Sequence, residues 1–91
     1  MSRQGKIMER AMLGMNLYGE ALPGLPLVEI VGKRRVLVEN HCGINCYTDS
    51  EIHINSRIGI IRVGGEELLI AKVTKEFLVI TGIINTVTIN N

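Results

Sequence analysis

The sequence predicts a small all-β domain, an antiparallel sandwich or roll of about eight short strands preceded by one N-terminal amphipathic helix. Three observations support this fold class. Apolar segments rich in Ile, Val and Leu run from residue 27 to residue 89, and β-branched residues fit pleated sheet better than helix. Turn residues interrupt these segments at roughly every eighth to tenth position. No segment after residue 26 has helical periodicity, which favours antiparallel strands over a βαβ fold.

Length and composition favour one domain with an aliphatic core. The chain has 91 residues, of which 46% are hydrophobic, and its only aromatic residues are two Tyr and one Phe. A net charge of +1 and the lack of aromatic stacking platforms argue against nucleic-acid binding. No apolar run approaches the roughly 20 residues of a membrane span, and no secretory signal is recognisable. With two cysteines, we expect reduced thiols in a cytoplasm.

Residues 1–19 are predicted to form a helical arm. Apolar side chains at spacings of three and four fall on one stripe, formed by Met8, Ala11, Met12, Met15 and Tyr18. Such a helix either packs on its own sheet or contacts a partner or a membrane surface. Residues 20–26 contain Pro23 and Pro26, which a helix cannot continue through, and are therefore a hinge before a β domain at 27–91.

The β domain is divided by its turn residues. Strands are predicted near 27–31, 34–39, 44–48, 52–55, 58–63, 66–73, 77–81 and 83–89. Gly32-Lys33 is a tight turn, residues 40–43 a wider one, and residues 74–76 a short reversal. Gly64-Gly65 lies between apolar stretches and is the strongest hairpin signal, because both residues tolerate positive φ.

Several late segments are apolar on both faces, which a chain of this size has little material to cover. Alternation places Leu68, Ile70, Leu78, Ile80 and Ile84 on one set of faces, and Leu69, Val79 and Ile83 on the other. We therefore expect a homo-oligomer or a docked arm. The predicted contact surface consists of Met8, Met12, Met15, Leu78, Ile80 and Ile84.

Few side chains are candidates for chemistry. His41, Cys42, Cys46 and His53 offer the donor types of a zinc shell, but their spacing is not that of a zinc knuckle, and Cys46 is expected to face the core. No metal site, cofactor or catalytic residue is therefore predicted, and the chain is not expected to be an enzyme. The basic run at residues 33–35 is either a solvated turn or, with Arg3, Lys6 and Arg10, a patch for anionic lipid or an acidic protein.

Two stretches resemble a known family. Residues 25–32 read Leu-Pro-Leu-Val-Glu-Ile-Val-Gly, and residues 38–44 contain a Glu-Asn-His-x-Gly-Ile turn. Together with the glycine-punctuated end, Leu78-x-Ile80-x-Gly82-x-Ile84, they resemble the YabP/YqfC family of sporulation proteins over roughly residues 20–89. The resemblance implies a small mother-cell protein of endospore-forming Firmicutes. It also implies a companion integral membrane protein, and neither enzymatic activity nor a cofactor.

The resulting expectation is a structural or assembly protein of endospore formation. It would act in the mother-cell cytoplasm near the forespore membrane, where peripheral contact with that membrane is an expected interaction. The alternative is a small ligand- or metal-binding β module that uses the Cys and His residues.

Overall fold

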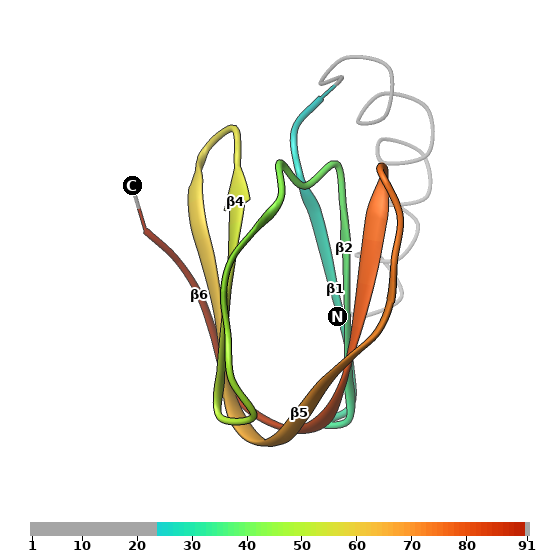
Figure 1. Cartoon of the computed structure of the whole chain (residues 1–91), viewed down its shortest axis with the longest axis vertical. Coiled ribbons are helices and arrows are strands. Elements are labelled where there is room, and N and C mark those ends of the chain that lie inside the picture. The colour runs from blue at the N-terminus through green and yellow to red at the C-terminus, as the bar shows by residue number, and fades with distance from the viewer. Residues whose placement is uncertain (1–23, 91) are drawn as a thin grey trace, which may run out of the picture.

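The computed structural model describes residues 24–90 and shows six antiparallel strands (Figure 1). The strands are β1 (Leu27–Val31), β2 (Arg35–Glu39), β3 (Ile44–Tyr47), β4 (Glu51–Ser56), β5 (Gly59–Val73) and β6 (Phe77–Asn90). They form a single sheet in the order β1-β2-β6-β5-β4-β3. The all-β prediction is confirmed for these residues, whereas the predicted arm at residues 1–19, its helix included, lies outside them.

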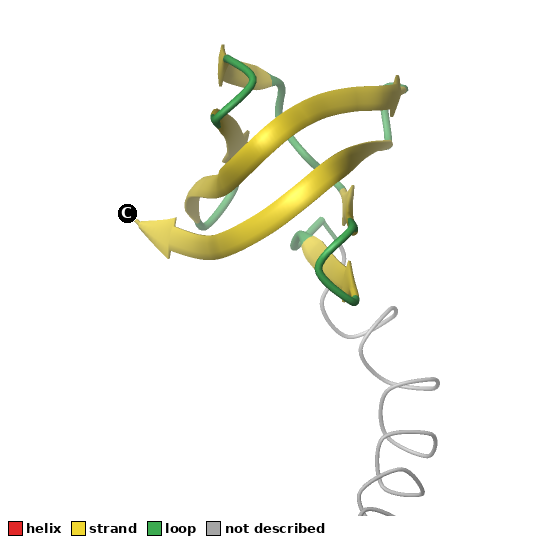
Figure 2. Ribbon diagram, turned by 90° about the horizontal axis from the view of Figure 1, so that it is seen from below, coloured by secondary structure: helices red, strands yellow, loops and turns green. Residues whose placement is uncertain are grey.

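The sheet is bent so that it forms two layers facing each other (Figure 1). β2 pairs with β6 only over residues 77–81, and β4 pairs with β5 only over residues 59–64. We call layer A the part made of β1, β2, residues 77–81 of β6 and residues 69–73 of β5. Layer B comprises β3, β4, residues 59–64 of β5 and residues 86–90 of β6. The two long strands cross from one layer to the other, as the view in Figure 2 shows.

The prediction of eight separate strands is therefore wrong in one respect. The segments 58–63 and 66–73 belong to one strand, β5, and the segments 77–81 and 83–89 belong to β6. Gly64-Gly65 is not a hairpin turn but part of the bend in β5, where the β5–β6 register shifts. The chain instead reverses before Gly59 and after Val73.

Glycines allow the two long strands to approach each other at the bend. A Cβ at Gly65 would overlap the carbonyl oxygen of Ile83. Gly82 has φ +138°, and a Cβ there would lie 2.6 Å from the carbonyl oxygen of Glu67. Side chains larger than hydrogen are thus excluded at both positions, which is a common reason for glycine inside a strand.

The core lies between the two layers. Its members are aliphatic side chains from four of the six strands, β2, β4, β5 and β6, namely Val36, Val38, Ile52, Ile54, Ile61, Val63, Leu68, Leu78, Ile80 and Ile84. The predicted division of the late segments into two sets of faces agrees with this arrangement. Burial of this area supplies the main driving force for folding.

The predicted contact surface is wrong for three of its residues. Leu78 and Ile80 are 0% exposed and Ile84 is 4% exposed, because the bent sheet covers its own inner face. That face therefore needs neither a helix nor a second chain to cover it. Met8, Met12 and Met15, the other three predicted residues, lie outside the described part of the chain.

Two turns close the bend from either side. The β1–β2 turn accepts hydrogen bonds from β6, and the β3–β4 turn accepts them from β5. The bonds are Ile84 N to Lys33 O (2.7 Å), Gly82 N to Arg34 O (3.2 Å), Gly65 N to Ser50 O (3.0 Å) and Leu68 N to Asp49 O (2.8 Å). Backbone groups that the sheet ladder leaves free at the bend are thereby satisfied.

Candidate functional site

His41 lies in the segment that crosses from layer A to layer B, between β2 and β3. Its Nε2–H donates to the carbonyl oxygen of Thr74 (2.7 Å), and its Nδ1 accepts from the backbone N–H of Gly43 (3.0 Å). Because a carbonyl oxygen can only accept, these contacts require the tautomer with the proton on Nε2. Nε2 therefore holds the crossover segment against the β5–β6 turn, and Nδ1 stabilises the conformation of the crossover segment itself.

The neighbouring Asn40 has a similar structural role. It adopts φ +61°, its backbone N–H donates to Glu76 O (2.6 Å), and its Nδ2 donates to Leu25 O (2.9 Å). Asparagine is among the residues that tolerate a left-handed backbone. The Glu-Asn-His-x-Gly-Ile motif thus specifies the crossover between the layers.

Replacing His41 with alanine is expected to lower the free energy of unfolding by about 1–2 kcal/mol, because two partly buried hydrogen bonds are lost. His53→Ala is the matched control. The His53 side chain is 16% exposed and hydrogen-bonds the exposed Glu51 carboxylate at 3.1 Å, so its removal should cost less than that of His41, about 0.5–1 kcal/mol. Urea denaturation measures both values. Equal losses for the two variants would contradict the structural role of His41.

The other candidate ligands do not converge with His41. Cys42 is exposed in the crossover segment, and Cys46 is half-buried opposite His53 on β3 and β4. The prediction that Cys46 faces the core is wrong, because the β3–β4 register shifts between Ile44 and Cys46 and pairs Cys46 with the outward-facing His53. Within residues 24–90, no three His, Cys, Asp or Glu side chains are placed to hold a metal ion.

The most unusual exposed surface is the outer face of layer A. Since Val36 and Ile80 face the core, their neighbours along each strand face outward. Cross-strand pairing then places one row across the sheet, in the order Val31, Arg35, Thr81 and Leu69. A second row runs through Glu29, Leu37, Val79 and Lys72. We call these eight residues, with Arg34 and Glu67, the outer surface.

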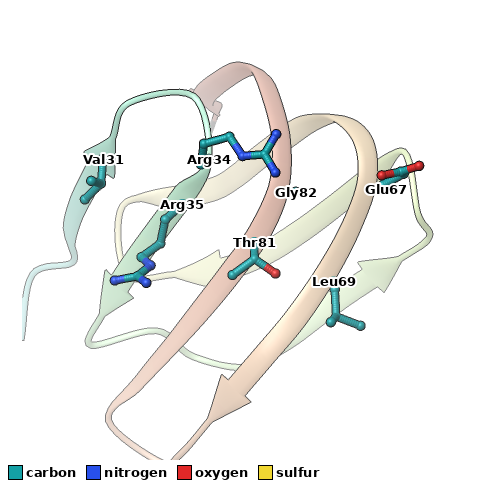
Figure 3. A pocket seen from close by; sticks show the side chains of 7 residues that line it. All are labelled: Val31, Arg34, Arg35, Glu67, Leu69, Thr81 and Gly82. Atoms are coloured by element: carbon teal, nitrogen blue, oxygen red, sulfur yellow. The ribbon is translucent and has the colours of Figure 1, made fainter.

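Part of the outer surface is hollowed. A shallow depression of about 550 Å³ is lined by Val31, Arg34, Arg35, Glu67, Leu69, Thr81 and Gly82. Figure 3 shows Thr81 and Gly82 in its middle, with the two arginines on one side and Glu67 and Leu69 on the other. Val31 is 51% exposed and Leu69 55% exposed, so apolar area lies open beside two guanidinium groups.

This combination fits contact with a protein. Arginine is enriched at protein interfaces, where its planar group packs on apolar area and hydrogen-bonds carboxylates. Sequence reasoning placed Leu69 and Val79 on one face but did not join them to Val31 and the arginines. Only the pairing of β1, β2, β6 and β5 brings these residues into the same rows.

The fold and this surface define a small bent-sheet module whose exposed chemistry suits protein contacts. The model of the YabP family matches residues 26–91, so the chain belongs to the YabP family. This finding confirms the resemblance noted in the sequence. Comparisons with curated proteins and with solved structures give no match. Residues 24–90 include no helix with the length and apolar character that a membrane span requires.

Proposed function

We propose that this protein is a non-enzymatic assembly protein of endospore formation that binds a protein partner through the outer surface. The observation that carries the proposal is the apolar area at Val31 and Leu69, which lies open beside Arg34 and Arg35 on the face opposite the core. Exposed apolar residues grouped with arginine commonly mark interaction sites.

Membership of the YabP family is consistent with a sporulation-associated role. The setting we propose is the mother cell near the forespore membrane, and the partner is a companion integral membrane protein. In this proposal His41 and His53 have structural roles, since each hydrogen-bonds a neighbouring group of the fold.

The proposal predicts a specific loss of partner binding. The full chain carrying an affinity tag is incubated with detergent-solubilised membranes from sporulating cells, and captured proteins are identified by mass spectrometry. Wild type is expected to capture an integral membrane protein. Leu69→Glu is expected to reduce that capture at least tenfold, because a carboxylate replaces exposed apolar contact area within the outer surface.

Ile58→Glu is the matched control. Ile58 is also an exposed apolar residue, 41% accessible, but it lies in the β4–β5 turn of layer B, away from the outer surface. This variant should capture the membrane protein as wild type does. Equal capture by Leu69→Glu and wild type would refute the outer surface as the binding site. Sporulation efficiency of cells that carry each variant gives a second readout with the same expected order.

A further inference from the structure

The second half of β6 has a free edge among the described residues. β2 covers β6 only as far as Thr81, and the β1–β2 turn caps it up to Ile84, through the hydrogen bond to Lys33. Residues 86–90 then pair with β5 on one side and with no described strand on the other. In Figure 2 this end of β6 runs out to the margin of the molecule.

Hydrogen-bond directions show which backbone groups face that edge. Gly65 donates its N–H to Ser50, away from β6. Alternate residues of a strand turn the same way, so Val63 and Ile61 also face away from β6. Opposed residues of an antiparallel pair either both bond to each other or both turn away. Val87 and Ile89, the partners of Val63 and Ile61, therefore direct their N–H and C=O groups to the free edge.

The other edges of the sheet carry protection that this one lacks. The outward N–H groups of Leu68 and Ile70 on β5 are capped by Asp49 O (2.8 Å) and by the hydroxyl of Tyr47 (3.0 Å). β3 has four residues and an irregular register. β1 has five residues, follows Pro26 and contains Glu29. Short length, bulges, proline and charge are the usual devices that prevent strand edges from pairing.

Residues 86–90 of β6 contain no charged residue, no proline and no register shift. This free segment is as short as β1, but it continues a 14-residue strand that has no charged residue and no proline from Phe77 to Asn90. Ile89, at the edge, is 47% exposed. An uncharged edge does not repel its own copy, and two identical edges related by a two-fold axis are automatically complementary. The edge has no charged residue that could attract an acidic or a basic partner. The favoured occupant is therefore a second copy of this chain.

We propose that residues 86–90 of β6 pair antiparallel with the same residues of a second copy, which joins the two B layers into one continuous sheet. The two-fold axis passes beside Thr88. In this register Val87 hydrogen-bonds Ile89 of the partner subunit, and Ile89 hydrogen-bonds Val87 of the partner subunit. The backbone N–H and C=O groups that both residues direct to the free edge are then paired. The exposed Ile89 side chain is then covered from the other copy. This dimer goes beyond the proposed function, because it involves neither the outer surface nor a membrane protein.

Charge substitution on the full chain tests the pairing. Thr88→Glu faces Arg62 within its own protomer, which preserves the fold, but places two carboxylates side by side at the two-fold axis. Thr81→Glu is the matched control, because Thr81 also faces an arginine, Arg35, but lies in layer A. Light scattering after size exclusion should give wild type and Thr81→Glu an even multiple of the 10.0 kDa chain mass. Thr88→Glu should halve that mass.

A second variant separates dissociation from misfolding. Ile89→Pro removes an N–H that faces the free edge, so the ladder with β5 is unaffected, and proline is tolerated at such positions. It should halve the mass and keep the circular dichroism spectrum of wild type.

Cross-linking tests the register. In a Cys42→Ser, Cys46→Ala background, Thr88→Cys should form an intermolecular disulfide on mild oxidation. Thr86→Cys should not, because the two-fold axis sets it opposite Asn90 of the partner subunit, about 14 Å from its own copy at roughly 3.4 Å per residue.

Four results would overturn the proposal. The first is a wild type that stays monomeric at high concentration. The second is an unchanged mass for both Thr88→Glu and Ile89→Pro. The third is a wild-type monomer that becomes a dimer only when residues 1–23 are deleted, which would make that segment the occupant of the edge. The fourth is a mass halved by Leu69→Glu but not by Thr88→Glu, which would assign self-association to the outer surface instead. Loss of membrane-protein capture by a variant whose mass is unchanged would separate the two proposals. It would show that the dimer forms independently of partner binding at the outer surface.

Discussion

Gly65→Ala is expected to lower the free energy of unfolding by about 3 kcal/mol, and so to leave a domain of this size largely unfolded under mild denaturing conditions. The new methyl group would overlap the carbonyl oxygen of Ile83. This oxygen belongs to the backbone of β6, which the β5–β6 ladder holds on both sides of the bend. Relief therefore requires the two long strands to move apart, which opens the core that they share.

Gly64→Ala is the matched control, one residue away. A Cβ at Gly64 meets only the side-chain oxygen of Thr86, at 2.6 Å, and Gly64 has no positive φ. Rotation of the Thr86 side chain relieves this contact, so the expected change is within about 1 kcal/mol of wild type. Midpoints of urea denaturation measure the difference, with an unchanged m value showing that the unfolding transition itself is the same. If both glycines tolerate alanine equally, the bend at Gly65 is not as close as described.

The second large effect is expected for Leu78→Ala. Leu78 is 0% exposed and packs between the two layers, so truncation removes apolar contact and leaves a cavity. The expected loss is about 3 kcal/mol. Val79→Ala is the control from the next position of the same strand. Val79 faces outward and is half-buried, and its truncation should cost about 1 kcal/mol or less.

The same denaturation series checks this pair of variants. A large loss for Val79→Ala with a small one for Leu78→Ala would reverse the inner and outer faces of β6. It would also restore Leu78 to the contact surface expected from the sequence. The pair matters for function, because the outer surface is available to a partner only if Val79, and not Leu78, faces outward.

Local pattern determined much of this protein. The all-β class, the first three strands and the β5–β6 reversal near residues 74–76 follow from β-branched runs and the turn residues between them. Alternation separated Leu68, Ile70, Leu78, Ile80 and Ile84 from Leu69 and Val79, because a strand turns successive side chains to opposite faces whatever surrounds it. These features depend on interactions between residues close in sequence.

Gly64-Gly65 shows where local reasoning ends. The same dipeptide permits a hairpin turn or a bend inside one strand, because glycine lacks a Cβ in either case. The choice is made by distant partners: Ser50 bonds Gly65, and Lys33 bonds Ile84 beside it, so the strand continues through the bend. A continuous strand brings the two layers together and buries the face that the sequence had suggested for contact with other chains.

The position of the exposed surfaces was likewise decided only by the tertiary structure. Val31 and Leu69 are 38 residues apart in the sequence, and they share a row because β2 and β6 lie between their strands. Within residues 24–90, the second half of β6 has a free edge because β2 ends its pairing at Thr81. Which face a residue takes is a property of its own strand, whereas which face is covered depends on how the whole sheet folds over itself.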